Sequence, residues 1–376
     1  MTYRIARFLA ENSPETPCLV IDLDAVAGAY DLLRRHLPLA RVYYAVKANP
    51  AREIVAMLAQ KGANFDVASR GEIELCRDCG IAADRLSFGN TIKKEKDIGF
   101  AYQAGVRLFA FDSIGELEKL ARAAPGSRVF CRILVPCDGA EWPLSRKFGC
   151  VPEMAVALLR EARARGLDPY GISFHVGSQQ TDTGQWDGAV REAARLFSLL
   201  AEADITLRMI NLGGGFPARY RAEVPAVEHY AQAVTGAITR HFGNDLPEIL
   251  VEPGRSLVGD AGIIQSEVVL IAKKGDSDDR RWVYLDVGKF NGLAETMDES
   301  IKYRIATPGR DGVLGPVILA GPTCDSADIL YERTEYRLPL GLEIGDKIEI
   351  LAAGAYTASY ASIGFNGFSP IRTYCI

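Results

Sequence analysis

The sequence predicts an α/β protein with a closed (β/α)8 barrel and a second, β-rich domain. Two observations lead to this prediction: strand-like and helix-like runs alternate eight times between residues 42 and 254, and helical periodicity becomes sparse after residue 262. Eight β-α units in about 210 residues are typical of a barrel with parallel strands. A doubly wound open sheet is the alternative, but no early G-x-G-x-x-G motif supports it.

The eight expected strands are short apolar runs bounded by turn residues. They are 42–47, 64–69, 85–89, 107–112, 128–135, 170–177, 207–213 and 248–254. Amphipathic runs that lie between them include 51–62, 113–124, 151–166 and 224–243. Several of these runs end in glycine, as helices often do, so we expect helices there.

The segments outside this alternation predict the second domain. Apolar runs at 262–274, 280–288, 315–322 and 345–356 are separated by Gly, Pro and Asp turns, which is typical of β-strands. The N-terminal run PCLVIDLDAV is expected to add a strand to this domain. We therefore expect a barrel domain over 24–262, and a domain resembling a β-sandwich or β-barrel formed by 1–23 and 263–376.

Composition excludes several classes of protein. Hydrophobic residues make up 48% of the 376 residues and charged residues 24%, which is ordinary for a soluble globular protein. The net charge of −5 argues against nucleic acid or an anionic membrane as a partner. No run approaches the roughly 20 apolar residues of a membrane helix, and we find no secretory signal pattern.

Cysteine and histidine usage predicts a cytoplasmic protein without a metal. The eight cysteines are scattered, which favours a reducing compartment over a disulfide framework. Cys76 and Cys79 have C-x-x-C spacing, but no second pair follows at the spacing of a zinc site. The four histidines form no H-E-x-x-H motif.

Unusual polar residues lie near the ends of the predicted strands. Lys47 interrupts an apolar run at the end of the first strand, where a lysine needs either water or a partner. Asp66, Arg132, His175 and Glu252 lie in or after the second, fifth, sixth and eighth strands. Each has an ordinary structural explanation alone. In a barrel, however, the C-terminal strand ends meet at one rim, where catalytic residues lie.

The loops after strands seven and eight predict a phosphate site. Gly213, Gly214 and Gly215 expose backbone N–H groups and permit the conformation of an anion nest, and these loops often bind phosphate in barrels. Arg255 could pair with the phosphate through two hydrogen bonds. A tight turn is the alternative explanation for the glycines, and an ion pair with Arg255 is the alternative for Glu252.

Together these residues predict pyridoxal 5′-phosphate as the cofactor, which attaches to a lysine amine and accepts an electron pair. Lys47 would supply the amine. His175 would stack on the pyridine ring, and Glu252 would hold a proton on the ring nitrogen by charge attraction.

The motifs resemble those of the fold-type III pyridoxal-phosphate decarboxylases, which act on ornithine, lysine, diaminopimelate and arginine. The matching motifs are YYAVKANP, FDVASRGEIE, SRKFGC, FHVGSQ, NLGGGFP, VEPGR, GPTCDSAD and GAYTASYASIGFNGF. They span almost the whole chain in order, and they are most similar to the bacterial ornithine or lysine/ornithine decarboxylases. The resemblance implies an alanine-racemase-like barrel and a carboxy-lyase of polyamine biosynthesis that converts L-ornithine to putrescine, with L-lysine, which would give cadaverine, as a further candidate substrate.

The resemblance also assigns roles to individual residues. Lys47 would bind the cofactor covalently, with Asp66 and Arg132 supporting the lysine and ring side of the pocket. Ser178 and Tyr356 would join the glycines and Arg255 around the phosphate.

The resemblance places substrate contacts in the β-rich domain. Cys324 would return a proton to the substrate carbon after CO2 leaves, and Asp325 would bind the distal ammonium of a basic amino acid. In the family this Cys-Asp pair comes from the partner subunit, so a homodimer would complete two shared sites. Asp298 is the candidate for a second ammonium contact, with Glu295 and Glu299 as competitors, because this chain lacks the tyrosine of the Tyr-Asp pair found nearby in eukaryotic ornithine enzymes.

Two other functions compete with decarboxylation. Alanine racemases share the fold, but there an arginine contacts the ring nitrogen, whereas VEPGR places the carboxylate of Glu252. A non-catalytic regulatory homologue would be expected to lose cofactor residues, whereas this chain keeps Lys47, Glu252, Arg255 and Cys324.

Overall fold

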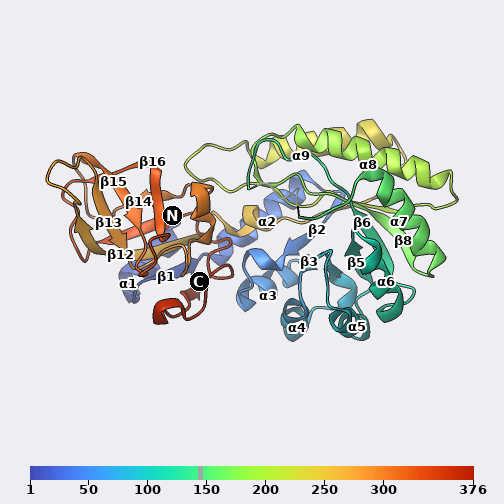
Figure 1. The fold of residues 1–376 in the computed structure, drawn as a ribbon, viewed down its shortest axis with the longest axis horizontal. Helices are drawn as coiled ribbons and strands as arrows, with labels where there is room; N and C mark the ends of the chain where they lie inside the picture. Colours follow the sequence, from blue (N-terminus) through green and yellow to red (C-terminus); the bar gives the residue numbers. More distant parts are fainter. Residues whose placement is uncertain (143–146) are drawn as a thin grey trace. The chain divides into compact units, whose positions relative to one another are not determined.

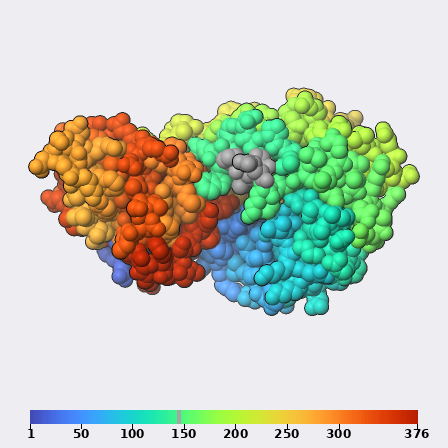
Figure 2. All heavy atoms as spheres, in the orientation of Figure 1, coloured from blue at the N-terminus to red at the C-terminus, as the bar shows by residue number. Residues whose placement is uncertain are grey.

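The computed structural model describes residues 1–142 and 147–376. The chain forms two compact units. The barrel unit comprises Ala27–Pro217 and Val224–Gly254, and the β-rich unit comprises Met1–Val26, Ala218–Glu223 and Arg255–Ile376. On the face seen in Figure 2, the β-rich unit is covered mostly by residues from the last third of the chain, coloured orange and red.

The barrel unit closes eight parallel strands into a ring, which confirms the predicted fold class. The strands are β2 (Ala40–Ala45), β3 (Asn64–Val67), β4 (Leu86–Phe88), β5 (Leu108–Phe111), β6 (Arg128–Arg132), β8 (Asp168–Ser173), β10 (Met209–Asn211) and β11 (Glu248–Val251). Their order around the ring is β10-β11-β2-β3-β4-β5-β6-β8. Figure 1 shows helices outside these strands, as alternating β-α units require.

The helices of this unit follow the amphipathic runs of the sequence. They are α2 (Leu23–His36), α3 (Arg52–Gln60), α4 (Arg70–Asp78), α5 (Glu95–Gln103), α6 (Ile114–Ala123), α7 (Pro152–Ala164), α8 (Gln185–Ala201) and α9 (Val227–Phe242), with 3-10 turns η1 (Val46–Ala48) and η2 (Ala83–Arg85). A separate two-stranded antiparallel sheet, formed by β7 (Ala140–Trp142) and β9 (Ser178–Gln180), was not expected from the sequence.

The strands are shorter than the apolar runs that predict them. Strand β2 ends at Ala45, so Lys47 lies on η1 rather than in the strand. Strand β8 likewise ends at Ser173, before His175. The reason is geometric: chain that leaves the barrel must turn toward a helix, and apolar residues continue to line that turn.

A group of large apolar side chains fills one layer of the barrel interior. Residues from five strands form this cluster: Tyr43, Leu108, Ala110, Phe130, Met209 and Leu250. Burying a side chain of this size stabilises the fold by about 1.5–3 kcal/mol. The cluster therefore makes the barrel a packed support for the residues at its rim.

The β-rich unit is built on an eight-stranded sheet. Its strands are β1 (Cys18–Ile21), β12 (Gly262–Ala272), β13 (Arg281–Leu285), β14 (Arg304–Ala306), β15 (Leu314–Ala320), β16 (Ile329–Pro339), β17 (Lys347–Leu351) and β18 (Arg372–Cys375). The main path runs β14-β17-β12-β13-β15-β16. Strand β1 pairs with β12 and β18, which confirms that an N-terminal strand joins this domain.

The sequence analysis missed the N-terminal helix α1 (Tyr3–Asn12) of this unit. The side chain of Thr2 accepts a hydrogen bond from the Ile5 amide, as an N-cap residue does. Ile5 and Leu9, one helical turn apart, pack into a cluster with Cys18 and Ile263. The unit also contains α10 (Arg255–Val258), η3 (Ala294–Glu299) and η4 (Phe365–Gly367). Over the described ranges, no helix is both long and apolar enough to cross a membrane.

A buried ion pair joins two segments of the barrel unit. Lys93 is fully buried, and its ammonium lies 3.0 Å from the carboxylate of Glu116, which is also buried. The ammonium donates to the carbonyl oxygens of Asn90 and Ala110 at 2.7 and 2.6 Å. Burial lowers the pKa of Lys93 to about 8, so these partners are needed to keep it charged.

Replacing Lys93 with methionine is expected to destabilise the barrel unit by about 3–5 kcal/mol, because it leaves the Glu116 carboxylate buried with Lys119 alone. Urea unfolding followed by tryptophan fluorescence measures the loss. Lys94→Met makes the same chemical change at the neighbouring exposed lysine and should alter stability by less than about 0.5 kcal/mol. Equal midpoints for the two variants would contradict a structural role for the buried pair.

Candidate active site

Lys47 lies at the carboxyl end of β2, on the turn η1. Its side chain is 49% exposed, and its ammonium lies 2.8 Å from Oδ2 of Asp66. The buried apolar strand before it is therefore a support, and the amine itself faces outward toward the rim. The Ala45 amide donates to the Pro253 carbonyl at 3.1 Å, which ties the end of β2 to the loop after β11.

Asp66 is 3% exposed and holds the lysine with one of its two oxygens. Its other oxygen, Oδ1, has no hydrogen-bond partner in the described part of the chain. A Cβ at Gly89 would lie 2.0 Å from that oxygen, so a side chain at position 89 would displace the carboxylate. Gly89 is thus part of the geometry that aims Asp66 at Lys47, and the sequence analysis missed it.

Glu72 is a further acidic neighbour that the sequence analysis did not assign. Its carboxylate accepts from the Ala68 amide at 2.6 Å, and its own amide donates to the side chain of Ser69. Burial raises the pKa of Glu72 to about 7, while the positive charge of Lys47 opposes this shift. The S-x-x-E spacing of a helix N-terminus was the available signal.

Glu252 follows β11 and is oriented by Asn211, a residue of the buried strand β10. The Asn211 side-chain amide donates to Glu252 Oε1 at 2.5 Å, and the Asn211 Oδ1 accepts from the Gly213 amide at 2.9 Å. Burial and the negative charge of Asp66 raise the pKa of Glu252, and Lys47 acts against them. Glu252 is therefore an oriented, buried carboxylate that a positively charged group would stabilise in its charged form.

His175 lies beyond the end of β8 with its ring in a fixed orientation. Its Nδ1 accepts a hydrogen bond from the Gly177 amide at 3.0 Å, so the neutral ring carries its proton on Nε2. Burial and the charges of Arg132 and Lys47 lower the pKa of His175 well below its ordinary value. A neutral flat imidazole at this place suits stacking on an aromatic ring.

The three glycines bring the loop after β10 close to its neighbours. A Cβ at Gly213 would lie 2.4 Å from the Phe174 carbonyl oxygen, and one at Gly214 would lie 2.6 Å from the Glu252 carbonyl oxygen. Gly213 also has a φ of +66°, which favours glycine. The backbone is therefore open at this point, as an anion-binding loop requires.

Two further barrel-unit residues predicted for the site are Arg132, at the end of a barrel strand, and Ser178, in the segment that follows β8. Arg132 is the last residue of β6. Burial lowers the pKa of its guanidinium, and the negative charges of Glu252, Asp112 and Asp66 oppose this shift. Ser178 begins β9, immediately after the FHVG segment. The first two residues of the SRKFGC motif, at positions 145 and 146, lie outside the described residues.

In the β-rich unit, Arg255 is held in a buried cluster. Its guanidinium donates two hydrogen bonds to Glu295, at 2.5 and 2.7 Å, and one to the Tyr220 hydroxyl at 2.6 Å. It also lies over the ring of Tyr356, 4.8 Å from the centroid. Tyr356 has a φ of +55°, which a non-glycine residue adopts rarely. The carboxylate that orients Arg255 is therefore Glu295.

Cys324 and Asp325 lie on an exposed loop. The loop is anchored by Asp328, which is 3% exposed. Its carboxylate accepts from the Lys289 amide at 2.7 Å and from the Thr323 hydroxyl at 2.7 Å. Asp328 is part of the GPTCDSAD motif, but the sequence analysis gave it no role.

The three acidic candidates on η3 have different surroundings. Glu295 is bound to Arg255. Glu299 is buried, and its carboxylate accepts from the amides of three successive residues, 332–334, at 2.7–2.9 Å. Although burial acts in the opposite direction, these hydrogen bonds lower the pKa of Glu299 to about 2. Asp298 is exposed and lines a pocket with Lys289 and Tyr360.

The barrel residues fit pyridoxal phosphate on structural grounds. Asp66 carries an unsatisfied buried oxygen beside the Lys47 amine. The glycine loop would be blocked by any side chain at position 213 or 214. A neutral imidazole and an oriented carboxylate complete the set. These are the groups needed to hold an aldehyde, an anionic phosphate, an aromatic ring and a basic ring nitrogen.

Comparison with known proteins identifies the family of the chain. Residues 23–259 match the model of the family described as pyridoxal-dependent decarboxylase, pyridoxal binding domain. A lysine/ornithine decarboxylase of Selenomonas ruminantium is 36% identical over 362 residues, which cover 96% of this chain and 89% of that protein. The structure of a lysine/ornithine decarboxylase from Vibrio vulnificus, complexed with cadaverine, has a TM-score of 0.88 and 30% identity, covering 100% of this chain and 98% of the other.

One relative bears a name that does not denote a decarboxylase. Antizyme inhibitor 2 of Xenopus laevis is 34% identical over 394 residues, covering 98% of this chain and 85% of that protein. Relatives with different names therefore have similar sequence identity to this chain. Both the match to the pyridoxal binding domain and the full-length similarity show that this chain belongs to the pyridoxal-dependent decarboxylases, whose cofactor is pyridoxal phosphate.

Proposed function

We propose that the protein decarboxylates a basic L-amino acid, converting L-ornithine to putrescine and also accepting L-lysine to give cadaverine. The observation that carries the proposal is the barrel rim, where Lys47 contacts Asp66 while Asn211 orients Glu252. The lysine/ornithine decarboxylases among its relatives support the choice of substrates. The place in polyamine biosynthesis and the cytoplasmic location stay predictions.

We assign the cofactor contacts as follows. Lys47 holds the cofactor covalently, and Asp66, aimed by Gly89, keeps that amine positioned. His175 packs against the ring, and Arg132 supports the same side of the pocket. The phosphate contacts are Gly213, Gly214, Gly215, Ser178, Arg255 and Tyr356, of which Arg255 is oriented by its ion pair with Glu295.

Glu252 favours decarboxylation over racemisation in this proposal. When bound, pyridoxal phosphate takes up the electron pair that CO2 leaves on the substrate's α-carbon. This capacity is greatest when the ring nitrogen is protonated, and Glu252, held by Asn211, keeps a proton at that nitrogen by opposite charge. A racemase needs a second base at the α-carbon instead.

The β-rich unit supplies the substrate contacts in this proposal. Cys324 donates a proton to the α-carbon, and Asp325 binds the distal ammonium. Asp298 is the second ammonium contact, because Glu295 and Glu299 are already engaged by Arg255 and by backbone amides. Because one extra methylene changes binding by only about 1–3 kcal/mol, ornithine and lysine are both substrates.

A CO2-release panel tests this function directly. With ornithine, lysine, arginine and diaminopimelate as substrates, we expect release from ornithine and lysine and at least about tenfold lower kcat/KM for the other two. Asp298→Asn should raise the KM for ornithine and lysine by about tenfold, because a charge-assisted hydrogen bond contributes about 1.5–3 kcal/mol.

Other outcomes of the panel separate the alternative functions. Loss of optical activity without CO2 would support a racemase. A protein that binds no pyridoxal phosphate, judged by its absorbance after reconstitution, would support a non-catalytic homologue. In a protein that does bind it, Lys47→Ala should abolish covalent retention after borohydride reduction, which provides the negative control.

Glu252→Gln should separate stability from activity. Because burial raises the pKa of Glu252 to about 7, the native state holds this proton more tightly than the unfolded chain, and the associated stability is lost mainly as pH rises toward and through about 7. In the cofactor-free protein, the variant should therefore melt at a higher temperature than wild type at pH 8 and at nearly the same temperature at pH 5. Decarboxylation should fall at least about tenfold. A variant that is less stable at pH 8 would contradict this assignment.

Subunit mixing tests the shared dimer site. Lys47→Ala and Cys324→Ala should each be inactive, and mixing them should restore about a quarter of wild-type activity, because random exchange puts half of the chains into heterodimers with one intact site each. Sedimentation or mass spectrometry must first show that subunits exchange. Exchange without recovered activity would place both residues in the same subunit's site.

A further inference from the structure

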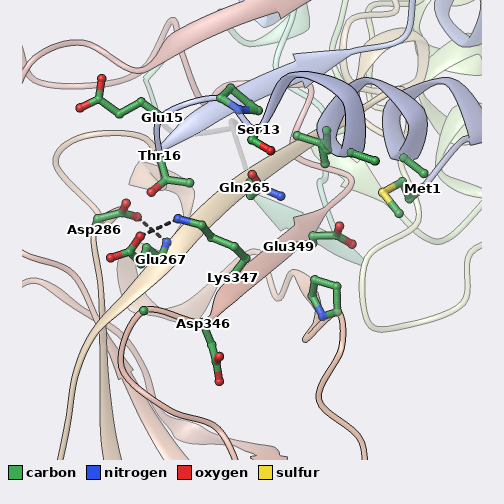
Figure 3. A pocket seen from close by; sticks show the side chains of 16 residues that line it. Met1, Ser13, Glu15, Thr16, Gln265, Glu267, Asp286, Asp346, Lys347 and Glu349 are labelled. Carbon is green, nitrogen blue, oxygen red and sulfur yellow. Dashed lines mark hydrogen bonds and ion pairs between the residues drawn. The ribbon is translucent and has the colours of Figure 1, made fainter.

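The β-rich unit contains a cavity of ≈ 950 Å³ that none of the proposed catalytic or substrate-binding residues lines. Its walls come from α1 and the segment after it, from β12 and from β17 (Figure 3). The helix that forms one wall is α1, which packs on the sheet through Ile5 and Leu9. The cavity therefore belongs to a stable part of the fold.

Two polar residues of this cavity are mostly buried and have no side-chain partner among the described residues. Glu349 is 6% exposed and Gln265 is 9% exposed. They lie opposite each other in the antiparallel pair of β12 and β17. Within residues 1–142 and 147–376, neither side chain makes a hydrogen bond or an ion pair. No side-chain atom of either residue is among the fully buried polar atoms that lack a partner, so their polar ends open into the cavity, where a ligand can contact them.

The cavity is strongly acidic, and most of its other charges are already paired. Lys347 lies 2.5 Å from Glu267, and Asp346 is bound by Arg310 at 2.8 Å. Asp286 accepts hydrogen bonds from the Ser266 hydroxyl and the Glu267 amide at 2.5 and 3.0 Å. Figure 3 shows Lys347 directed toward Glu267 and Asp286.

Glu349 and Glu15 are the cavity carboxylates that form no hydrogen bond or ion pair with the described residues. Burial raises the pKa of Glu349, and the charge of the chain's α-ammonium, on a residue that also lines the cavity, opposes this shift. Glu15 is exposed and follows α1 at the cavity rim. The two carboxylates come from different elements, with the apolar side chains of Leu9, Ala10 and Pro14 also lining the cavity.

We propose that this cavity binds an aliphatic diamine. One ammonium would donate to the Glu349 carboxylate and to the Gln265 carbonyl oxygen, the second would lie toward Glu15, and the methylene chain would contact the apolar wall. A primary ammonium has three donors and matches these acceptors. Diamines are also the product class of the proposed reaction, so the cavity is suited to sense product; binding itself does not depend on that function.

Titration calorimetry of the cofactor-loaded protein with putrescine and cadaverine tests the proposal. The active-site contribution is removed by saturating with ornithine analogues that cannot lose CO2, and one diamine per chain should still bind. Glu349→Gln should weaken this binding at least tenfold, equivalent to about 1.4 kcal/mol. Glu332→Gln removes one negative charge from an exposed position on β16 and serves as the matched control.

A second variant keeps the test decisive if Glu349→Gln folds poorly. Gln265→Met preserves side-chain size, removes the carbonyl acceptor and should weaken binding at least threefold. Unchanged diamine binding in both variants, or equal weakening by Glu332→Gln, would overturn the proposal. Basal CO2 release in the absence of diamine should be unchanged in both variants. If wild type releases no CO2 from any basic amino acid, the proposed function fails, while binding that Glu349→Gln weakens still establishes the diamine site.

Discussion

Closure of the barrel is the constraint on which the candidate active site depends. Because its eight strands are parallel, their carboxyl ends meet at one rim whatever the distance between them in sequence. The Ala45–Pro253 backbone bond joins the first and last strand ends there. As a result Lys47 reaches Asp66, and Asn211 reaches Glu252, across 19 and 41 positions of the sequence.

Several carboxylates lie close together at the rim, where burial makes their charged forms unfavourable. Burial raises the pKa values of Glu72 and Glu252, and the positive charge of Lys47 offsets this only in part. Such an arrangement costs stability in the cofactor-free protein and is typical of sites that bind a cation. The ring nitrogen of pyridoxal phosphate, protonated beside Glu252, would supply that positive charge.

In the β-rich unit, buried carboxylates hold the exposed ones in place. Asp328 anchors the loop that carries Cys324 and Asp325, and Glu299 fixes η3 beneath Asp298 through three backbone amides. The acids with the strongest protein contacts are therefore structural, and the exposed acids remain available to a substrate. Glu349 is mostly buried but forms no hydrogen bond or ion pair with the described residues, which is why we propose a ligand for it.

The sequence alone determined the β-α alternation, the N-terminal strand of the β-rich domain, the family and its cofactor. These features can be read from the sequence because periodicity is a local property and the motifs occur in a fixed order along the chain. It did not reveal helix α1, the buried Lys93–Glu116 pair or the role of Gly89. Nor could it tell that Lys47, which follows an apolar run, is half exposed, while Lys93, which follows the polar residues Asn90 and Thr91, has a fully buried side chain. It named Asp298 as the candidate ammonium contact, with Glu295 and Glu299 as competitors, but could not show how their surroundings differ. Only the tertiary structure decided these points, because burial and partner choice depend on contacts between residues far apart in sequence.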